Sequence, residues 1–252
     1  MSNLFGCKGR IALVTGASRG LGLQAAAALA EAGATVILNA RDQTALEIAA
    51  DQIRARGGSV ETVQGDLVTG AASVVEEAVA FKGRLDIVVH AAAARDRRST
   101  SELPGEAFRS LVENNLACVY DLGKATLPYL SLSKAGRLIF LSSIAARMAR
   151  AGDPAYAAAK GGVSALTRAF AVECGKSTIT VNAIAPGFFA TETNQELINS
   201  AGIRDFLKMR VPSQRCGRPD EIASAVLFLA STASSYVNGI TLTVDGGLSA
   251  QM

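Results

Sequence analysis

Several residue types that would point to particular functions are scarce in this chain. Its 252 residues include no tryptophan, one histidine (His90) and four cysteines, none of them in a Cys-x-x-Cys pair. Zinc and other soft-metal sites need clusters of histidine and cysteine at short spacings. We therefore expect no metal site and four reduced thiols, as is usual for a cytoplasmic protein.

Charge and long apolar runs are also limited. The formal net charge is only +3 and the basic residues are dispersed, which argues against nucleic-acid binding. No apolar run reaches the ~18 residues that a membrane span requires, and the first residues lack the layout of a signal peptide. We expect a protein without membrane or nucleic-acid partners.

What the chain does have is apolar surface and glycine in a regular alternation. Hydrophobic residues make up 49% of the sequence, and 24 residues are glycine. Short apolar runs that suit buried strands alternate with longer segments of helical periodicity. Strands are expected over 10–15, 35–39, 60–64, 85–89, 138–141, 179–183 and 240–244. Helices are expected over 21–32, 43–56, 71–81, 107–132, 154–174 and 220–230.

This alternation predicts an α/β fold: a doubly wound, mostly parallel, seven-stranded Rossmann-like sheet with helices on both faces. We expect residues 1–252 to form a single domain, because no linker or repeat interrupts the pattern. The polar segment 187–214 is long for a loop. It is either a substrate lid with short helices or a disordered excursion.

A glycine-rich turn follows the first expected strand. Gly16, Gly20 and Gly22 lead directly into an alanine-rich helix. In that context glycines let backbone N–H groups approach a pyrophosphate at the helix N-terminus. The spacing Gly-x-x-x-Gly-x-Gly therefore predicts a dinucleotide site, although such a turn can also be purely structural.

The end of the second expected strand bears on which dinucleotide binds. An acidic residue here would bond the ribose 2′-hydroxyl of NAD, but the strand ends Asn39-Ala40-Arg41 and the first acid is Asp42. Arg41, with Arg19 from the glycine turn, could pair with a 2′-phosphate. We predict NADP, with NAD possible, and interpret Asp42 as a helix N-cap.

Three further polar positions leave alternatives open. Asp66 follows the third strand and could either contact an adenine or cap the next helix. His90 precedes three alanines, and we interpret it as structural or adjacent to the cofactor rather than catalytic. Asn114 and Asn115 interrupt an apolar helix, where one of them could order water, bridge a helix irregularity or simply be exposed.

The strongest candidate for chemistry is the stretch 138–162. A buried strand ends on Ser142 and Ser143, and a following helix carries Tyr156 and Lys160 on one face. An ammonium near a phenol favours the phenolate, so we expect Lys160 to lower the tyrosine pKa. A tyrosine of that kind can act as a general acid or base, whereas the alternative is an ordinary surface pair.

The order and spacing of these motifs resemble the short-chain dehydrogenase/reductase family over nearly the whole chain. Thr15 to Gly22 resembles the family's Thr-Gly-x-x-x-Gly-x-Gly cofactor loop, and Tyr156 with Lys160 its Tyr-x-x-x-Lys motif. The resemblance implies cofactor contacts from Thr15, Gly16, Ser18, Arg19, Gly20, Leu21, Gly22, Arg41, Asp66, Leu67, His90, Ala91, Ala92, Tyr156, Lys160, Pro186, Gly187 and Thr191.

The same resemblance implies a catalytic set of Asn115, Ser143, Tyr156 and Lys160. Tyr156 would exchange the proton, Ser143 would hold the substrate oxygen, and Lys160 would lower the tyrosine pKa and bond the ribose. Asn115 would hold a water that links Lys160 to solvent. The chain departs from the family where His90-Ala91-Ala92-Ala93 replaces Asn-Asn-Ala-Gly, which bears on local sheet geometry and cofactor affinity.

The substrate is less determined. The segment around 187–221 resembles sugar-acid dehydrogenases of the gluconate 5-dehydrogenase kind, and 3-oxoacyl-carrier-protein reductases share many motifs. The expected substrate is thus a carbonyl or secondary alcohol, with a sugar acid or a 3-oxoacyl compound as candidates. One or two of five loop arginines could hold an anionic group on it: Arg95, Arg97, Arg98, Arg147 and Arg150.

Other functions also remain open. The chain could be a catalytically silent NADP-binding interaction protein, an NAD-dependent catabolic alcohol dehydrogenase, or an epimerase or dehydratase of the same superfamily. Members of this branch are commonly tetramers. The resemblance therefore implies a homotetramer packed through 107–132 and 154–174.

Overall fold

The computed structural model describes residues 4–192, 198 and 200–251. Within them, seven strands form one sheet in the order β3-β2-β1-β4-β5-β6-β7, and every neighbouring pair is parallel. The strands are β1 (Ile11–Thr15), β2 (Thr35–Ala40), β3 (Ser59–Gln64), β4 (Ile87–His90), β5 (Arg137–Leu141), β6 (Thr180–Pro186) and β7 (Thr241–Val244). The predicted doubly wound fold is confirmed, and the described pairings are parallel throughout.

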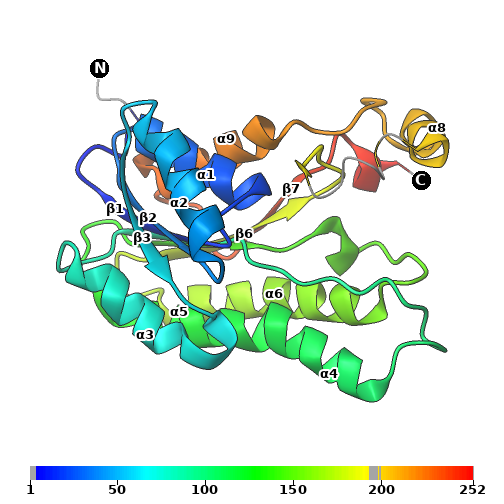
Figure 1. Ribbon diagram of the computed structural model, residues 1–252, viewed down its shortest axis with the longest axis horizontal. Coiled ribbons are helices and arrows are strands. Elements are labelled where there is room, and N and C mark those ends of the chain that lie inside the picture. Colours follow the sequence, from blue (N-terminus) through cyan, green and yellow to red (C-terminus); the bar gives the residue numbers. More distant parts are fainter. Residues whose placement is uncertain (1–3, 193–197, 199, 252) are drawn as a thin grey trace.

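Helices cover both faces of this sheet, as Figure 1 shows. One face carries α1 (Gly20–Glu31), α2 (Gln43–Arg54) and α9 (Pro219–Ala230), whose apolar side chains share a core with β1 and β2. The other face carries α3 (Leu67–Ala80), α4 (Gly105–Val112), α5 (Cys118–Leu130) and α6 (Pro154–Glu173). Because both faces are covered, the central strands β1, β4 and β5 are buried at every position.

The strand order reverses beside β1. The chain runs outward from β1 through β2 to β3 and then crosses back to β4 on the other side of β1. The loops that leave β1 and β4 therefore turn to opposite faces of the sheet. This separation opens a crevice at the carboxyl ends of the strands, which is where ligands bind in such folds.

The helix expected over 107–132 is not one regular helix. It begins at Gly105 and ends at Leu130, and a π-helical segment, Glu113–Ala117, separates α4 from α5. The irregularity that the two asparagines suggested is thus present, and Asn115 lies within it. π-helical turns of this kind occur frequently at functional sites.

The helix expected over 71–81 begins four residues earlier than predicted. The side chain of Asp66 accepts a hydrogen bond from the backbone N–H of Val68 and starts α3 at Leu67. Gly70 then has non-helical backbone angles within α3. The early start brings the first turn of α3 to the carboxyl edge of the sheet.

The segment expected to form a lid contains helix α8 (Ala201–Arg210) in its described part. Leu207 and Val211 pack with Leu248 near the C-terminus, and the rings of Phe188 and Phe206 lie 5.3 Å apart. Residues 193–197 and 199 of the expected lid lie outside the described residues. None of the helices that the structure describes is long and apolar enough to cross a membrane.

His90 has a structural place at the end of β4. Its side chain is fully buried, and its Nδ1 lies 2.8 Å from Oγ1 of Thr15, the residue opposite it in β1. Its Nε2 has no hydrogen-bond partner among the described residues. Burial, together with the positive charge of Lys160, lowers the pKa of His90 to about 3, so the imidazole is neutral in the folded protein.

This pKa predicts an acid-dependent loss of stability that the single histidine makes easy to isolate. The unfolded chain binds a proton at His90 below its ordinary pKa of 6.5, whereas the folded chain does not until about pH 3. Stability is therefore lost as pH falls between these values, by about 2 kcal/mol from His90 alone between about pH 7 and pH 5. Chemical denaturation at both pH values, on wild type and His90→Asn, measures the difference.

The Asn variant cannot titrate, and all other groups are common to both proteins. The wild type should lose about 2 kcal/mol more than the variant over this pH interval. Equal losses in the two proteins would show that His90 is not held neutral by the fold.

Candidate active site

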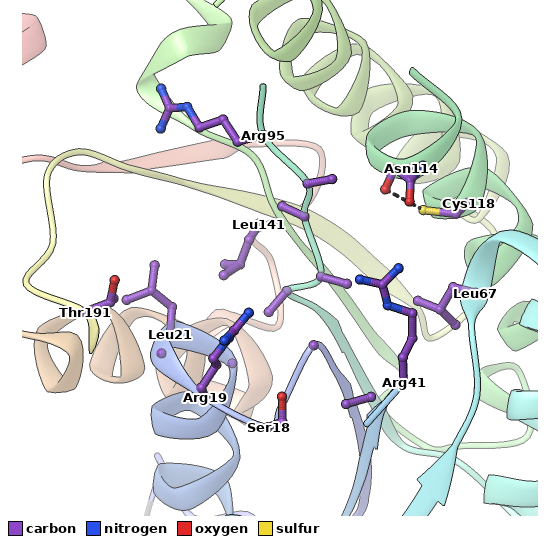
Figure 2. Close-up of a pocket in the computed structure, with 18 of the residues that line it drawn as sticks. Ser18, Arg19, Leu21, Arg41, Leu67, Arg95, Asn114, Cys118, Leu141 and Thr191 are labelled. Atoms are coloured by element: carbon purple, nitrogen blue, oxygen red, sulfur yellow. Dashed lines mark hydrogen bonds between the residues drawn. The ribbon is translucent and has the colours of Figure 1, made fainter. Parts of the chain in front are cut away.

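A pocket of about 660 Å³ lies at the carboxyl edge of the sheet, where β1, β2, β4, β5 and β6 end. Figure 2 shows Arg19 and Arg41 extending into it from the turn before α1 and from the end of β2, with Arg95 at another part of the rim. The pocket thus occupies the crevice that the strand reversal opens.

The glycines of the first turn are required by close backbone packing. Gly16 has φ +65°, and a Cβ on it would lie 2.5 Å from the backbone nitrogen of Ala92. A Cβ on Gly22 would lie 2.3 Å from the carbonyl oxygen of Gly16. Such distances are too short for any side chain, so only glycine lets this turn pack against the segment after β4. The first turn of α1 is left open to the pocket, as a bound pyrophosphate would require.

An exposed arginine lies at the pocket where β2 ends. Arg41 is 75% exposed at the pocket, and its Nη1 lies 3.8 Å from Oδ2 of Asp66. Asn39 is buried and donates hydrogen bonds to the carbonyls of Val63 and Gly65, so its side chain is occupied within the sheet. Asp42 accepts a hydrogen bond from the N–H of Ala45, which confirms it as the N-cap of α2.

The serine, tyrosine and lysine of stretch 138–162 meet at this pocket. Ser143 follows β5 and accepts a hydrogen bond from the N–H of Ala145, and its hydroxyl lowers the pKa of the neighbouring Tyr156. Lys160 is 1% exposed, and its ammonium donates to the carbonyl of Leu141 at 2.8 Å. Ser142 instead donates to the carbonyl of Lys160 and is bonded to Ser164, which leaves Ser143 as the serine that faces Tyr156.

The expectation that Lys160 lowers the pKa of Tyr156 is wrong for this structure. Burial dominates and raises the pKa of Tyr156 above its ordinary value, against the opposing effects of the Arg95 guanidinium and the Ser143 hydrogen bond. The ammonium of Lys160 lies 5.7 Å from the ring centroid, whereas the guanidinium carbon of Arg95 lies 4.5 Å from it. Burial also lowers the pKa of Lys160 to about 8.

Asn115 lies behind the pocket wall. Its side chain is fully buried, accepts a hydrogen bond from the N–H of Ala94 and donates to the carbonyls of Ala94 and Leu111. The amide group therefore clamps the segment after β4 onto the π-helical turn. This leaves its amide N–H groups no capacity to bind water.

The five loop arginines differ in their surroundings. Arg95 forms hydrogen bonds with both carboxylate oxygens of Asp153, and Arg98 pairs with Asp96. Arg150 lies 3.8 Å from Asp153. Arg97 lines the pocket and forms no salt bridge within the described part of the chain, and Arg147 lies outside the pocket lining.

Most predicted site residues do line the pocket. These are Gly16, Ser18, Arg19, Gly20, Leu21, Gly22, Arg41, Asp66, Leu67, Ala91, Ala92, Ser143, Tyr156, Lys160, Pro186, Gly187 and Thr191. Thr15, His90 and Asn115 are buried behind the lining rather than part of it.

The lining also holds residues that were not predicted to belong to the site. Asn114 and Cys118 lie one helical turn apart, joined by a hydrogen bond from the Cys118 thiol to the Asn114 carbonyl (Figure 2). Phe189 is a third. The four-residue spacing of Asn114 and Cys118 placed them on one helix face, but nothing in the sequence indicated that this face borders the pocket.

Comparisons with known proteins agree with this geometry over the full chain. A family model described as enoyl-(acyl carrier protein) reductase matches residues 16–249. Gluconate 5-dehydrogenase of Gluconobacter oxydans is 35% identical over 253 residues, 99% of this chain and 98% of that protein. A 3-oxoacyl-[acyl-carrier-protein] reductase of Pseudomonas aeruginosa is 38% identical over 96% of this chain and 98% of its own.

Solved structures give the same result. The crystal structure of a gluconate 5-dehydrogenase from Burkholderia cenocepacia in complex with NADP and tartrate has a TM-score of 0.94 and 34% identity, and the match covers 99% of both chains. Likeness of sequence and fold thus extends from the glycine turn to the last strand. The chain belongs to the short-chain dehydrogenase/reductase family and is an NAD(P)-dependent oxidoreductase that acts on a CH–OH group.

Proposed function

We propose that this protein transfers a hydride between NADP(H) and the carbonyl or secondary alcohol of a small anionic substrate, with sugar acids of the gluconate kind as the favoured class. The observation that carries the proposal is the meeting of Ser143, Tyr156 and Lys160 in the same pocket as the glycine turn and Arg41. One pocket therefore offers both a dinucleotide site and an acid–base group.

Ser143, Tyr156 and Lys160 have separate roles in the proposed reaction. A bound nicotinamide would supply or accept the hydride. The phenol of Tyr156, whose pKa burial raises further above neutral pH, is protonated, so its hydroxyl can donate a proton to a carbonyl oxygen during reduction. Ser143 hydrogen-bonds the same oxygen as charge develops on it. Lys160, held by the Leu141 carbonyl, keeps a positive charge on the same helix face.

The role of Tyr156 predicts a specific loss. Tyr156→Phe removes only the hydroxyl, so kcat/KM for carbonyl reduction should fall at least about 100-fold because general acid catalysis is lost. Cofactor affinity, measured by fluorescence titration, should stay within a few-fold of wild type. Tyr236→Phe on the fully exposed Tyr236 is the matched control. A Phe variant at 156 that kept full activity would contradict the role.

The choice of NADP rests on Arg41 and on the missing acid at the end of β2. Four solved relatives contain NADP. They are the Burkholderia enzyme, a putative gluconate 5-dehydrogenase from Beutenbergia cavernae, and two Agrobacterium tumefaciens proteins, a putative 2-deoxy-D-gluconate 3-dehydrogenase and a 3-oxoacyl (acyl-carrier-protein) reductase. In this chain Arg41 is exposed beside Asp66, where a guanidinium can pair with a 2′-phosphate.

The proposed contact between Arg41 and the 2′-phosphate predicts how a change at Arg41 alters the affinity for each cofactor. Arg41→Ala should weaken NADPH binding about 10–100-fold and leave NADH binding nearly unchanged, because only NADPH carries the 2′-phosphate. Titration of both cofactors measures this. Arg56→Ala, which removes an exposed arginine paired with Glu31 elsewhere, controls for net charge. If wild type bound NADH as well as NADPH, an NAD-dependent catabolic dehydrogenase would be favoured.

The anionic substrate class is supported by Arg97 and by the relatives' names. Those relatives act on gluconate or on 3-oxoacyl-[acyl-carrier-protein], and the Burkholderia structure also contains tartrate. Arg97 lines the pocket without a salt-bridge partner in the described chain, so its guanidinium is available for a carboxylate. Arg95 and Arg98 already have acidic partners.

This predicts a substrate-selective effect. Arg97→Met should raise KM for a sugar acid about 10-fold or more and leave KM for an uncharged polyol unchanged. Steady-state kinetics on both substrates measure it, with Arg147→Met as the control for a loop arginine outside the pocket. An equal effect on both substrates would contradict carboxylate binding by Arg97.

We further propose that the segment 187–214 acts as a lid and that the protein is a cytoplasmic homotetramer. Helix α8 and the bridge between Phe189 and Gly217 support a lid built of short elements. Leu132 follows α5 and Val172 lies near the end of α6, and they are 75% and 80% exposed, as apolar residues at a subunit interface would be in one isolated chain.

A further inference from the structure

Tyr156 has a second cationic neighbour besides the lysine of its own motif. The guanidinium carbon of Arg95 lies 4.5 Å from the centroid of the Tyr156 ring, a distance at which a cation and an aromatic face attract. Arg95 comes from the segment after β4, and Tyr156 from the first turn of α6. Figure 2 shows the side chain of Arg95 at the rim of the pocket.

A buried carboxylate keeps Arg95 in this place. Asp153, immediately before α6, is 1% exposed and accepts hydrogen bonds from Nε and Nη2 of Arg95, the first at 2.9 Å. A buried carboxylate is strongly destabilising without a partner, so the two-point bond is held firmly. Because Asp153 is three residues from Tyr156, the same short stretch of chain fixes the tyrosine and its cation.

The charged and polar groups around the phenol of Tyr156 come from three parts of the chain. Arg95 and Arg97 approach from the segment after β4, Ser143 from the end of β5, and Asp153 and Lys160 from α6 and the residue before it. Lys160 is farther from the ring than Arg95, and its ammonium donates to the Leu141 carbonyl. Arg95 is thus the nearer of the two cations and the one anchored by its own carboxylate.

We propose that Arg95, held by Asp153, is a positioning residue for Tyr156, whose phenolate it stabilises and whose ring it orients. This rests on the proposed acid–base role of Tyr156 and assigns Arg95 an action through the tyrosine. A cation at this distance lowers the free energy of the phenolate relative to the phenol. Loss of the cation therefore raises the pKa of the tyrosine further above its ordinary value.

The chain allows this coupling to be measured without activity. It contains no tryptophan and only four tyrosines, so the ultraviolet absorbance of tyrosinate is well isolated. A rapid pH-jump titration of each protein, minus the same titration of its Tyr156→Phe counterpart, gives the ionisation midpoint of Tyr156. Arg95→Met should raise this midpoint by about one pH unit, and Arg95→Lys should restore most of the difference.

Two further variants keep the test decisive. Arg98→Met removes a charge from the same loop, where Arg98 pairs with exposed Asp96, and should leave the midpoint unchanged. The double variant Arg95→Met, Asp153→Asn leaves no unpaired buried carboxylate. It should therefore fold even if the single Arg95→Met variant is too unstable to titrate. Its midpoint should also rise, because Arg95 acts on Tyr156 more strongly than Asp153 does.

Kinetics separate this role from substrate binding. With an uncharged secondary alcohol, the acid limb of the kcat/KM profile for oxidation should move to higher pH in Arg95→Met by the same amount as the titration midpoint. A midpoint that did not move in either Met variant would overturn the inference. So would a rise in KM confined to anionic substrates with the midpoint unchanged, since that would make Arg95 a substrate-binding residue only.

A different result would contradict the proposed acid–base role of Tyr156. If Tyr156→Phe kept its activity, the acid–base role of Tyr156 would be lost. The titration would still report whether Arg95 and Tyr156 are coupled.

Discussion

The close packing of two backbone turns determines the rest of this site. The turn after β1 lies so near the segment after β4 that a Cβ on Gly16 would come within 2.5 Å of Ala92, and a Cβ on Gly22 within 2.3 Å of Gly16. This packing occurs at the point where the strand order reverses. It leaves the first turn of α1 open to the pocket. A cofactor pyrophosphate would find backbone N–H groups there rather than side chains.

Burial changes the pKa values of Tyr156 and Lys160 more than the neighbouring charges do. Tyr156 and Lys160 are both removed from water, so each is shifted toward its neutral form: the phenol stays protonated, and the ammonium loses part of its ordinary basicity. In such surroundings the position of one cation matters more than the number of cations. Arg95, tied to a buried carboxylate, is better placed than Lys160, which is bonded to a strand carbonyl.

The sequence allowed much of the fold and site to be predicted, for identifiable reasons. Fully buried parallel strands appear as short apolar runs, and all seven were located to within two or three residues. The glycine spacing and the Tyr156–Lys160 pair lie within single turns, so local rules were sufficient. The start of α3 was missed because Asp66 had two possible roles, a cap or an adenine contact, and its cap was not assigned.

What could not be predicted depends on contacts between distant residues. Arg95 and Asp153 are 58 positions apart, and no periodicity relates a loop arginine to an aspartate before another helix. The pKa of Tyr156 was predicted from its motif partner alone, whereas burial and Arg95, both tertiary features, act on it. The same holds for the five loop arginines, which only the folded chain divides into paired and available groups.

The segment 91–95 links the glycine turn to Tyr156. Three anchors hold it: Thr15 accepts from the N–H of Ala91, Asn115 bonds both backbone groups of Ala94, and Asp153 binds the side chain of Arg95. At one end its alanines pack against the glycine turn, and at the other it delivers a guanidinium to Tyr156. His90, one residue earlier, is joined to Thr15 and so steadies the same segment where it leaves the sheet. A shift of this segment would therefore alter the cofactor cradle and the ionisation of Tyr156 together.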